Sequence, residues 1–166
     1  QMVMNVLGEE ISAINAAVHL NKLLQISAGG VYTDSGEAIA FDVSNRYKVL
    51  KEVINESSQK VLVFVPFKHV IQIVRDALIK DNIATEVIDG SVSVSKRTDI
   101  FKNFQTKADP QVLVIQPQAA AHGVTLTRAN TIVWWGPTSS LETYAQANAR
   151  IHRSGQTHKC TVVQLV

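Results

Sequence analysis

The stretch that decides the fold runs from residue 60 to residue 90, KVLVFVPFKHVIQIVRDALIKDNIATEVIDG. It holds an apolar run at 61–65, an amphipathic helical pattern at 70–78, and a second apolar run at 84–88 that closes at Asp89-Gly90. A strand of successive apolar residues is buried on both faces, which is typical of a parallel strand between two helical layers. The stretch therefore predicts a β-α-β unit of a parallel sheet.

The same alternation continues toward the C-terminus. A helix with Ile100 and Phe104 facing inward precedes apolar runs at 112–115 and 131–134, and a last apolar run, buried and opened by Cys160, occupies 160–166. Between these runs, Ser139 and Glu142 have the spacing of a capping box for a helix through Arg153, with Gly155 where that helix would end. We expect an α/β fold over residues 44–166, and the right-handed crossover rule leaves few topologies, of which a RecA-like open parallel sheet with helices on both faces is one.

Residues 1–43 carry a different pattern. Apolar positions predict a helix over 9–26 that stops at Gly29-Gly30, and the runs 31–32 and 38–41 predict a small hairpin. Ser44 is expected to cap the next helix. We expect this N-terminal segment to be part of the same lobe or a bridge to another one.

Composition narrows the class of protein. The chain has 166 residues, of which 46% are hydrophobic and 18% charged, so we expect one globular domain rather than a disordered tail. A net charge of +2 permits a polyanionic partner without requiring one. The absence of an apolar run of roughly 20 residues argues against a membrane span. The start at Gln1 suggests a piece of a longer protein.

Cysteine and histidine usage excludes further classes. The single Cys160 cannot form an internal disulfide, which favours an intracellular protein. The five histidines lack paired spacing with acids or cysteines, so no metal site is expected.

Gln146, Arg150 and Arg153 are four and three residues apart, which places them on one stripe of the predicted helix. Two arginines one turn apart repel each other unless an anion lies between them, and the guanidinium fork matches phosphate oxygens. The alternative is a solvated face whose arginines pair with local carboxylates. Glu142, the nearest acid on the helix, is two turns from Arg150, which favours the phosphate interpretation.

The segment 146–156, QANARIHRSGQ, resembles motif VI of the Swi/Snf-type translocases, a branch of the superfamily-two helicases. It keeps the glutamine, both arginines, the histidine between them and the Gly-Gln ending. Segments 61–67, 89–104 and 123–126 are similar to motif IV, to a Gly-Ser turn leading into an Arg-bearing helix, and to motif V. The resemblance covers roughly residues 44–166.

This resemblance implies the second motor lobe of an ATP-dependent enzyme. ATP and Mg²⁺ would be bound mainly by the N-terminal RecA-like lobe of the same protein, because this chain lacks a P-loop; residues 90–96, GSVSVSK, miss the second glycine. The isolated chain is therefore expected to be inactive. The implied catalytic residues are Arg150 and Arg153 as arginine fingers with Gln146, and the implied nucleotide-cleft residues are Gly123, Val124 and Thr125.

The resemblance also implies binding of double-stranded DNA without sequence specificity, through phosphate contacts. Five candidates near strand ends are Lys68, Lys96, Arg97, Gln118 and Arg128, although each of them alone is more often simply a solvated side chain than a DNA contact.

Some positions depart from the family pattern. Ala120-Ala121 replace a Gly-Gly pair, Thr125 replaces an asparagine, and residues 139–141 (SSL) replace Trp-Asn-Pro. Trp134 and Trp135 are expected to be core and lid residues. These departures keep open a degenerate lobe that binds nucleic acid or protein without ATPase activity. A Rossmann-like transferase or oxidoreductase is disfavoured because no Gly-x-Gly-x-x-Gly follows a strand.

Overall fold

The computed structural model describes residues 2–6, 9–13, 15–120 and 123–166. Its main sheet has five parallel strands in the order β6-β7-β5-β8-β9. The strands are β5 (Lys60–Phe64), β6 (Thr85–Ile88), β7 (Val112–Ile115), β8 (Ala129–Trp134) and β9 (Thr161–Gln164). The predicted RecA-like α/β fold is confirmed, and the 60–90 stretch supplies the central strand and one edge strand.

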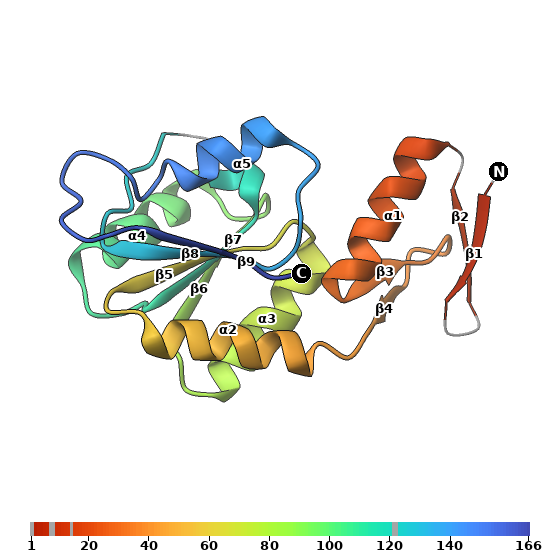
Figure 1. Cartoon of the computed structure of the whole chain (residues 1–166), viewed down its shortest axis with the longest axis horizontal. Helices are drawn as coiled ribbons and strands as arrows, with labels where there is room; N and C mark the ends of the chain where they lie inside the picture. Colours follow the sequence, from red (N-terminus) through yellow and green to blue (C-terminus); the bar gives the residue numbers. More distant parts are fainter. Residues whose placement is uncertain (1, 7–8, 14, 121–122) are drawn as a thin grey trace.

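Helices cover both faces of this sheet (Figure 1). On one face lie α2 (Ser44–Glu56) and α3 (Lys68–Lys80); on the other lie α4 (Val94–Thr106), the short 3-10 helix η1 (Pro117–Ala120) and α5 (Leu141–Asn148). Strand β5 shows why two layers are needed, since Leu62 and Phe64 pack into the α4–α5 core while Val61 and Val63 pack into the α2–α3 core. All four side chains are fully buried.

The N-terminal segment extends away from the lobe as a hairpin, a helix and a second hairpin (Figure 1). Its elements are β1 (Met2–Val6), β2 (Glu9–Ala13), α1 (Ala16–Ala28), β3 (Gly30–Tyr32) and β4 (Ala38–Ala40). The helix predicted from residue 9 was wrong in its first part, because residues 9–13 pair with β1 in an antiparallel register instead. The helix begins after Asn15, whose side chain accepts a hydrogen bond from Val18 N at 3.0 Å; Ile14 lies outside the described residues.

The end of α1 and the hairpin after it agree with the prediction. Gly29 has a φ of 106° and its N–H donates back to the last turn, a left-handed ending that glycine adopts without steric cost. The hairpin pairs β3 with β4. At Gly30, an added Cβ would lie 2.8 Å from the His69 ring, so this close packing against α3 requires glycine.

Trp135 attaches the end of α1 to the lobe, and Trp134 holds α5 within the lobe. Trp134 and Trp135 are both fully buried, which confirms the expected core position. The indole Nε1 of Trp135 donates to Ala28 O at 2.7 Å, and Nε1 of Trp134 donates to Asn148 Oδ1 at 2.9 Å. The first bond holds the end of α1, and the second holds the end of α5.

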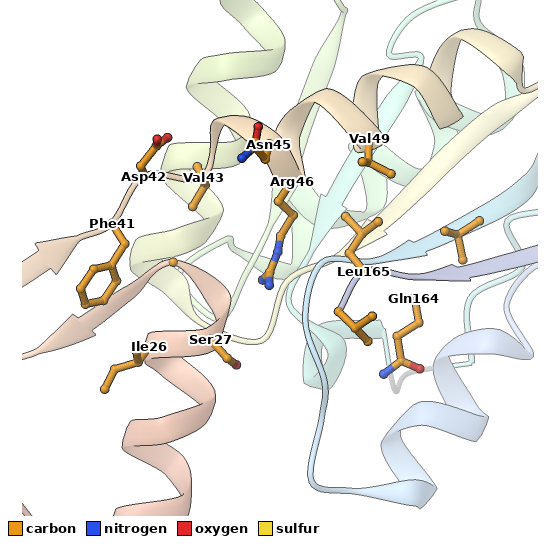
Figure 2. A pocket seen from close by; sticks show the side chains of 13 residues that line it. Ile26, Ser27, Phe41, Asp42, Val43, Asn45, Arg46, Val49, Gln164 and Leu165 are labelled. Atoms are coloured by element: carbon orange, nitrogen blue, oxygen red, sulfur yellow. The ribbon is translucent and has the colours of Figure 1, made fainter.

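A pocket of about 590 Å³ lies where the N-terminal segment meets α2 and the end of β9 (Figure 2). Its lining is mostly apolar and includes Phe41, Val49 and Leu165. Arg46 extends into this region, and its Nη1 donates to Trp135 O at 3.1 Å.

Three local predictions need correction. Ser44 begins α2 but does not cap it with its side chain; its backbone N–H donates to Asp42 Oδ1 at 2.9 Å. Ser140, not Ser139, caps α5 by accepting from Thr143 N at 3.1 Å. The last strand begins at Thr161 and lies at the sheet edge, so it is largely exposed, and Cys160 precedes it.

None of the helices within the described ranges has the length and apolar character needed to cross a membrane.

Candidate phosphate-binding site

The two arginines lie in a loop, not on a helix. Helix α5 ends at Asn148, and residues 149–158, here the arginine loop, turn back toward β9. The predicted single stripe with Gln146 was therefore wrong. The bond from Trp134 to Asn148 and the bond from Leu126 N to Arg150 O (2.9 Å) hold the chain in this non-helical path.

Arg150 is buried, with 5% of its surface exposed, which corrects the expectation of an exposed side chain. Its Nε donates to Gln146 O at 2.9 Å, while its Nη1 is buried without a hydrogen-bond partner among the described residues. Burial lowers the pKa of the Arg150 guanidinium, and the neighbouring charge of Arg153 lowers it further. A buried cation without a counter-ion is costly, so this site is suited to an incoming anion.

Arg153 is partly exposed and joins the arginine loop to residues 123–128, here the motif V segment. Its Nη1 donates to Gly123 O at 2.8 Å and to Thr125 Oγ1 at 3.3 Å, and its Nε donates to Ala149 O at 3.2 Å. All three acceptors are neutral oxygens. The positive charge of Arg153 is thus oriented by the protein but not neutralised.

Neither arginine has a carboxylate partner among the described residues. The ion pairs that these residues form are Lys51–Asp81, between α2 and the C-cap of α3, and Arg75–Asp76 on α3. The alternative, a solvated face whose arginines pair with local carboxylates, is therefore wrong for the described residues. Two guanidinium groups without carboxylate partners, one of them with an unpaired Nη1 among the described residues, are the kind of donors that bind phosphate oxygens.

The motif V segment lies against the arginine loop, as the predicted cleft requires. Gly123 has a φ of 71°, and apart from its chain neighbours no atom of the described residues lies within 4 Å of where a Cβ would be, so glycine serves the backbone conformation there rather than a close approach. Val124 packs against the α4–α5 core and Thr125 contacts Arg153. The departure at Ala120-Ala121 is only half visible: Ala120 is buried in η1, while Ala121 lies outside the described residues.

Gln146 is not directed at the arginines. Its Nε2 donates to Glu142 Oε1 at 2.9 Å, one turn earlier on α5. Its backbone oxygen, not its amide, is what contacts Arg150.

Gln156 is a residue of this site to which the sequence assigned no role. Its Nε2 lies within 3.3 Å of three carbonyl oxygens, those of Thr127, Ala129 and Ile151. The Gly-Gln ending of the motif was the only signal in the sequence. Thr127 and Ala129 belong to one segment and Ile151 lies more than twenty residues further along the chain, so the meeting of the two segments depends on the fold.

The five DNA-contact candidates do not share one location. Lys68, Lys96 and Gln118 are exposed and follow the carboxyl ends of β5, β6 and β7. Arg128 precedes β8, and because the strands are parallel it lies at the opposite edge of the sheet.

Arg97 follows β6 but is occupied by its own turn. Its Nη2 donates to Asp89 O and Val92 O, both at 3.4 Å, which supports the turn before α4.

The helicase conserved C-terminal domain family matches residues 45–155 of this chain. The chain belongs to this family. The match contains four of the five parallel strands, β5 to β8, and ends inside the arginine loop. It leaves residues 1–43 outside, and the role of that segment as part of the lobe or as a bridge stays a prediction.

Several curated proteins have sequences similar to this helicase domain. The chromatin-remodeling ATPase INO80 of Mus musculus is 30% identical over 138 residues, which cover 81% of this chain and 8% of INO80. The ATP-dependent helicase fft2 of Schizosaccharomyces pombe is 29% identical over 126 residues, covering 74% of this chain and 10% of fft2. This helicase domain thus spans a tenth or less of the relatives it matches.

A solved structure gives the same placement. The crystal structure of the C-terminal part of the Fun30 ATPase domain superposes with a TM-score of 0.69 at 25% identity, covering 73% of this chain and 40% of that one. Together these findings confirm the resemblance to the C-terminal RecA-like lobe of Swi/Snf-type superfamily-two ATPases.

Proposed function

We propose that this helicase domain is the second motor lobe of an ATP-dependent double-stranded DNA translocase and supplies its arginine fingers. The observation that carries the proposal is the pair Arg150 and Arg153: neither has a carboxylate partner, and Nη1 of Arg150 is buried without any partner among the described residues. The names of the relatives, an ATPase and an ATP-dependent helicase, support the same reaction class.

In this mechanism the nucleotide lies between this domain and the N-terminal RecA-like lobe of the same protein. Arg150 and Arg153 donate to phosphate oxygens as charge develops during phosphoryl transfer. An arginine in this role contributes about 10³ to 10⁵ in rate, or roughly 4 to 7 kcal/mol of barrier. Gly123, Val124 and Thr125 line the cleft beside Arg153, and Gln146 orients the γ-phosphate or water once its amide leaves Glu142.

Mg²⁺ would neutralise charge on the β- and γ-phosphates, and we assign its binding mainly to the first lobe. Within the described residues, no three His, Cys, Asp or Glu side chains gather into a metal-binding group. This division of ligands is why we expect the chain to be inactive without its partner lobe. We also propose an intracellular location for the protein.

The proposed DNA track follows the carboxyl edge of the sheet. Lys68, Lys96 and Gln118 present exposed cations and an amide there, and such contacts to phosphates carry no sequence information. Arg97 supports this surface by holding the turn before α4, and Arg128 is excluded from the track by its position at the other edge.

A degenerate lobe that binds nucleic acid or protein without ATPase activity is the second candidate. It is favoured by the bond between Gln146 and Glu142, which directs the amide away from the arginines. The two candidates make opposite predictions for ATP turnover.

The test is DNA-stimulated ATP turnover of the full-length protein carrying Arg153→Ala. We expect a loss of at least about 10³-fold with near-normal thermal melting. Arg128→Ala is the matched control, because Arg128 is exposed and lies at the opposite sheet edge. Unchanged turnover in Arg153→Ala contradicts the proposal, and DNA binding by a wild-type protein without any turnover supports the degenerate lobe.

A further inference from the structure

Gln156 holds the arginine loop against the start of β8. Its Nε2 lies 2.9 Å from Ala129 O, 3.1 Å from Ile151 O and 3.3 Å from Thr127 O, and its Oε1 accepts from His158 N at 3.0 Å. A primary amide has two N–H groups, so these three carbonyls share them. One half-buried side chain therefore joins the entry to β8, the first turn after α5 and the end of the arginine loop.

The same residue closes the turn that carries Arg153. Gln156 N donates to Arg153 O at 3.0 Å, and Gly155 within that turn has a φ of 95°. The backbone bond sets the shape of the turn, and the side-chain bonds attach the turn to the sheet. The position of the Arg153 guanidinium relative to Gly123 thus depends on where Gln156 is anchored.

We propose that Gln156 is a positioning residue that places the Arg153 finger by tying its turn to the start of β8. The inference rests on the proposed role of Arg153. Because the motif V segment leads directly into β8, the same anchor keeps the finger in register with that segment. Displacement of a catalytic group by about 1 Å can cost about 10²-fold in rate, so loss of the anchor acts on turnover before it acts on folding.

Gln105 provides a matched control, because its side chain also bonds to residues 127–129. Its Oε1 accepts from Arg128 N at 3.0 Å and its Nε2 donates to Thr127 Oγ1 at 3.4 Å. Gln105 is also half-buried, but it belongs to α4 and its side-chain bonds do not reach the arginine loop. Replacing either glutamine by methionine removes an amide of the same size that bonds to residues 127–129.

The experiment compares Gln156→Met and Gln105→Met in the full-length protein at saturating ATP and DNA. For Gln156→Met we expect kcat to fall about 10- to 10²-fold while KM for ATP stays near wild type, with the melting temperature lowered by the loss of the amide donor but still well above the assay temperature. For Gln105→Met we expect kcat to be retained. Equal losses in both variants, a fall in melting temperature that accounts for the lost turnover, or an unchanged kcat in Gln156→Met overturns the inference.

A second arm places Gln156→Met in the Arg153→Ala background, measured in single turnovers with enzyme in excess. A residue that acts through Arg153 causes no further loss there, whereas a full additional loss contradicts the positioning role. Should Gln156→Met fail to fold, Gln156→Asn replaces it. The shortened amide keeps a donor but cannot reach both Ala129 O at the start of β8 and Ile151 O in the arginine loop. If Arg153→Ala is fully active, the proposed function fails; if Arg153→Ala is inactive and Gln156→Met is fully active, only this inference fails.

Discussion

The two faces of the sheet treat positive charge differently. On the α2–α3 face, Lys51 pairs with Asp81 at 2.9 Å and Arg75 with Asp76 at 3.6 Å, and Asp81 also accepts from the Tyr47 hydroxyl at 2.7 Å. Both ion pairs formed by the described residues lie on this face, although Arg46 on α2 donates to the neutral Trp135 O at 3.1 Å. On the α4–α5 face, by contrast, three cations donate to neutral oxygens and belong to no ion pair among the described residues.

Three cations show this on the α4–α5 face. Arg150 donates to Gln146 O, Arg153 donates to Gly123 O, and the Lys60 ammonium donates to Phe104 O and Lys107 O at the end of α4. None of the three belongs to an ion pair formed by the described residues. A cation held only by carbonyl dipoles keeps its net charge and can still bind an anion, whereas a cation paired with a carboxylate cannot do so without breaking that pair.

Lys60 and Arg150 differ in whether their charged nitrogen atoms have hydrogen-bond partners within the described residues. Both are buried, and burial lowers the pKa of each. Nζ of Lys60 has two carbonyl partners at a helix C-terminus, where a cation is favourable, while Nη1 of Arg150 has no partner in the described part of the chain. We therefore expect Lys60 to stabilise the fold and Arg150 to serve the reaction.

Replacement of Arg150 by methionine has the largest expected effect. Arg150→Met in the full-length protein is expected to lower DNA-stimulated ATP turnover by about 10³-fold or more, because the finger is lost. Its melting temperature should be unchanged or higher, since removal of an unpaired buried charge is neutral or stabilising by about 1 kcal/mol or more. A variant that is both inactive and clearly less stable would assign Arg150 to the fold instead.

Replacement of Lys60 tests the opposite case. Lys60→Met leaves Phe104 O and Lys107 O without their donor, which we expect to cost about 1 to 3 kcal/mol in the free energy of unfolding. Denaturant unfolding measures this loss, and ATP turnover well below the melting temperature should be retained. Strongly reduced turnover in a folded Lys60→Met protein would break the distinction between the two cations.

A substitution on the α2–α3 face, which carries the ion pairs, should have the smallest effect on stability and turnover. Hydrogen bonds from Tyr47 and Lys51 lower the pKa of the Asp81 carboxyl, so its stabilising contribution is present above the ordinary carboxyl range and is lost as pH falls through the lowered folded-state value. Asp81→Asn is therefore expected to melt slightly earlier than wild type at neutral pH and to converge with it in acid. ATP turnover should not change; a pH-independent difference in melting would point to packing instead of charge.

The elements that the sequence predicted correctly are those whose pattern is local. The apolar run at 61–65 and the helix after it follow from residue spacing alone, as does the glycine stop at Gly29. The first hairpin was missed because residues 9–13 have apolar positions compatible with a helix, and only the presence of β1 as a partner decides for a strand. The end of α5 was placed too late for a similar reason, since the contact between Trp134 and Asn148 is not encoded in the local spacing.

The sequence by itself determined the parallel α/β class, the family motif and the identity of Arg150 and Arg153 as candidate phosphate ligands, because strand burial, helix periodicity and motif spacing are properties of short segments. Only the tertiary structure decided that Arg150 is buried with an Nη1 that has no partner among the described residues, and that Arg153 donates to Gly123 O. It also decided that Arg128 lies at the amino ends of the strands and that the Gln156 amide bonds to the start of β8. Each of these depends on segments distant in sequence meeting in space, and hydrogen bonds and burial at such crossings are set by the packing of the whole sheet.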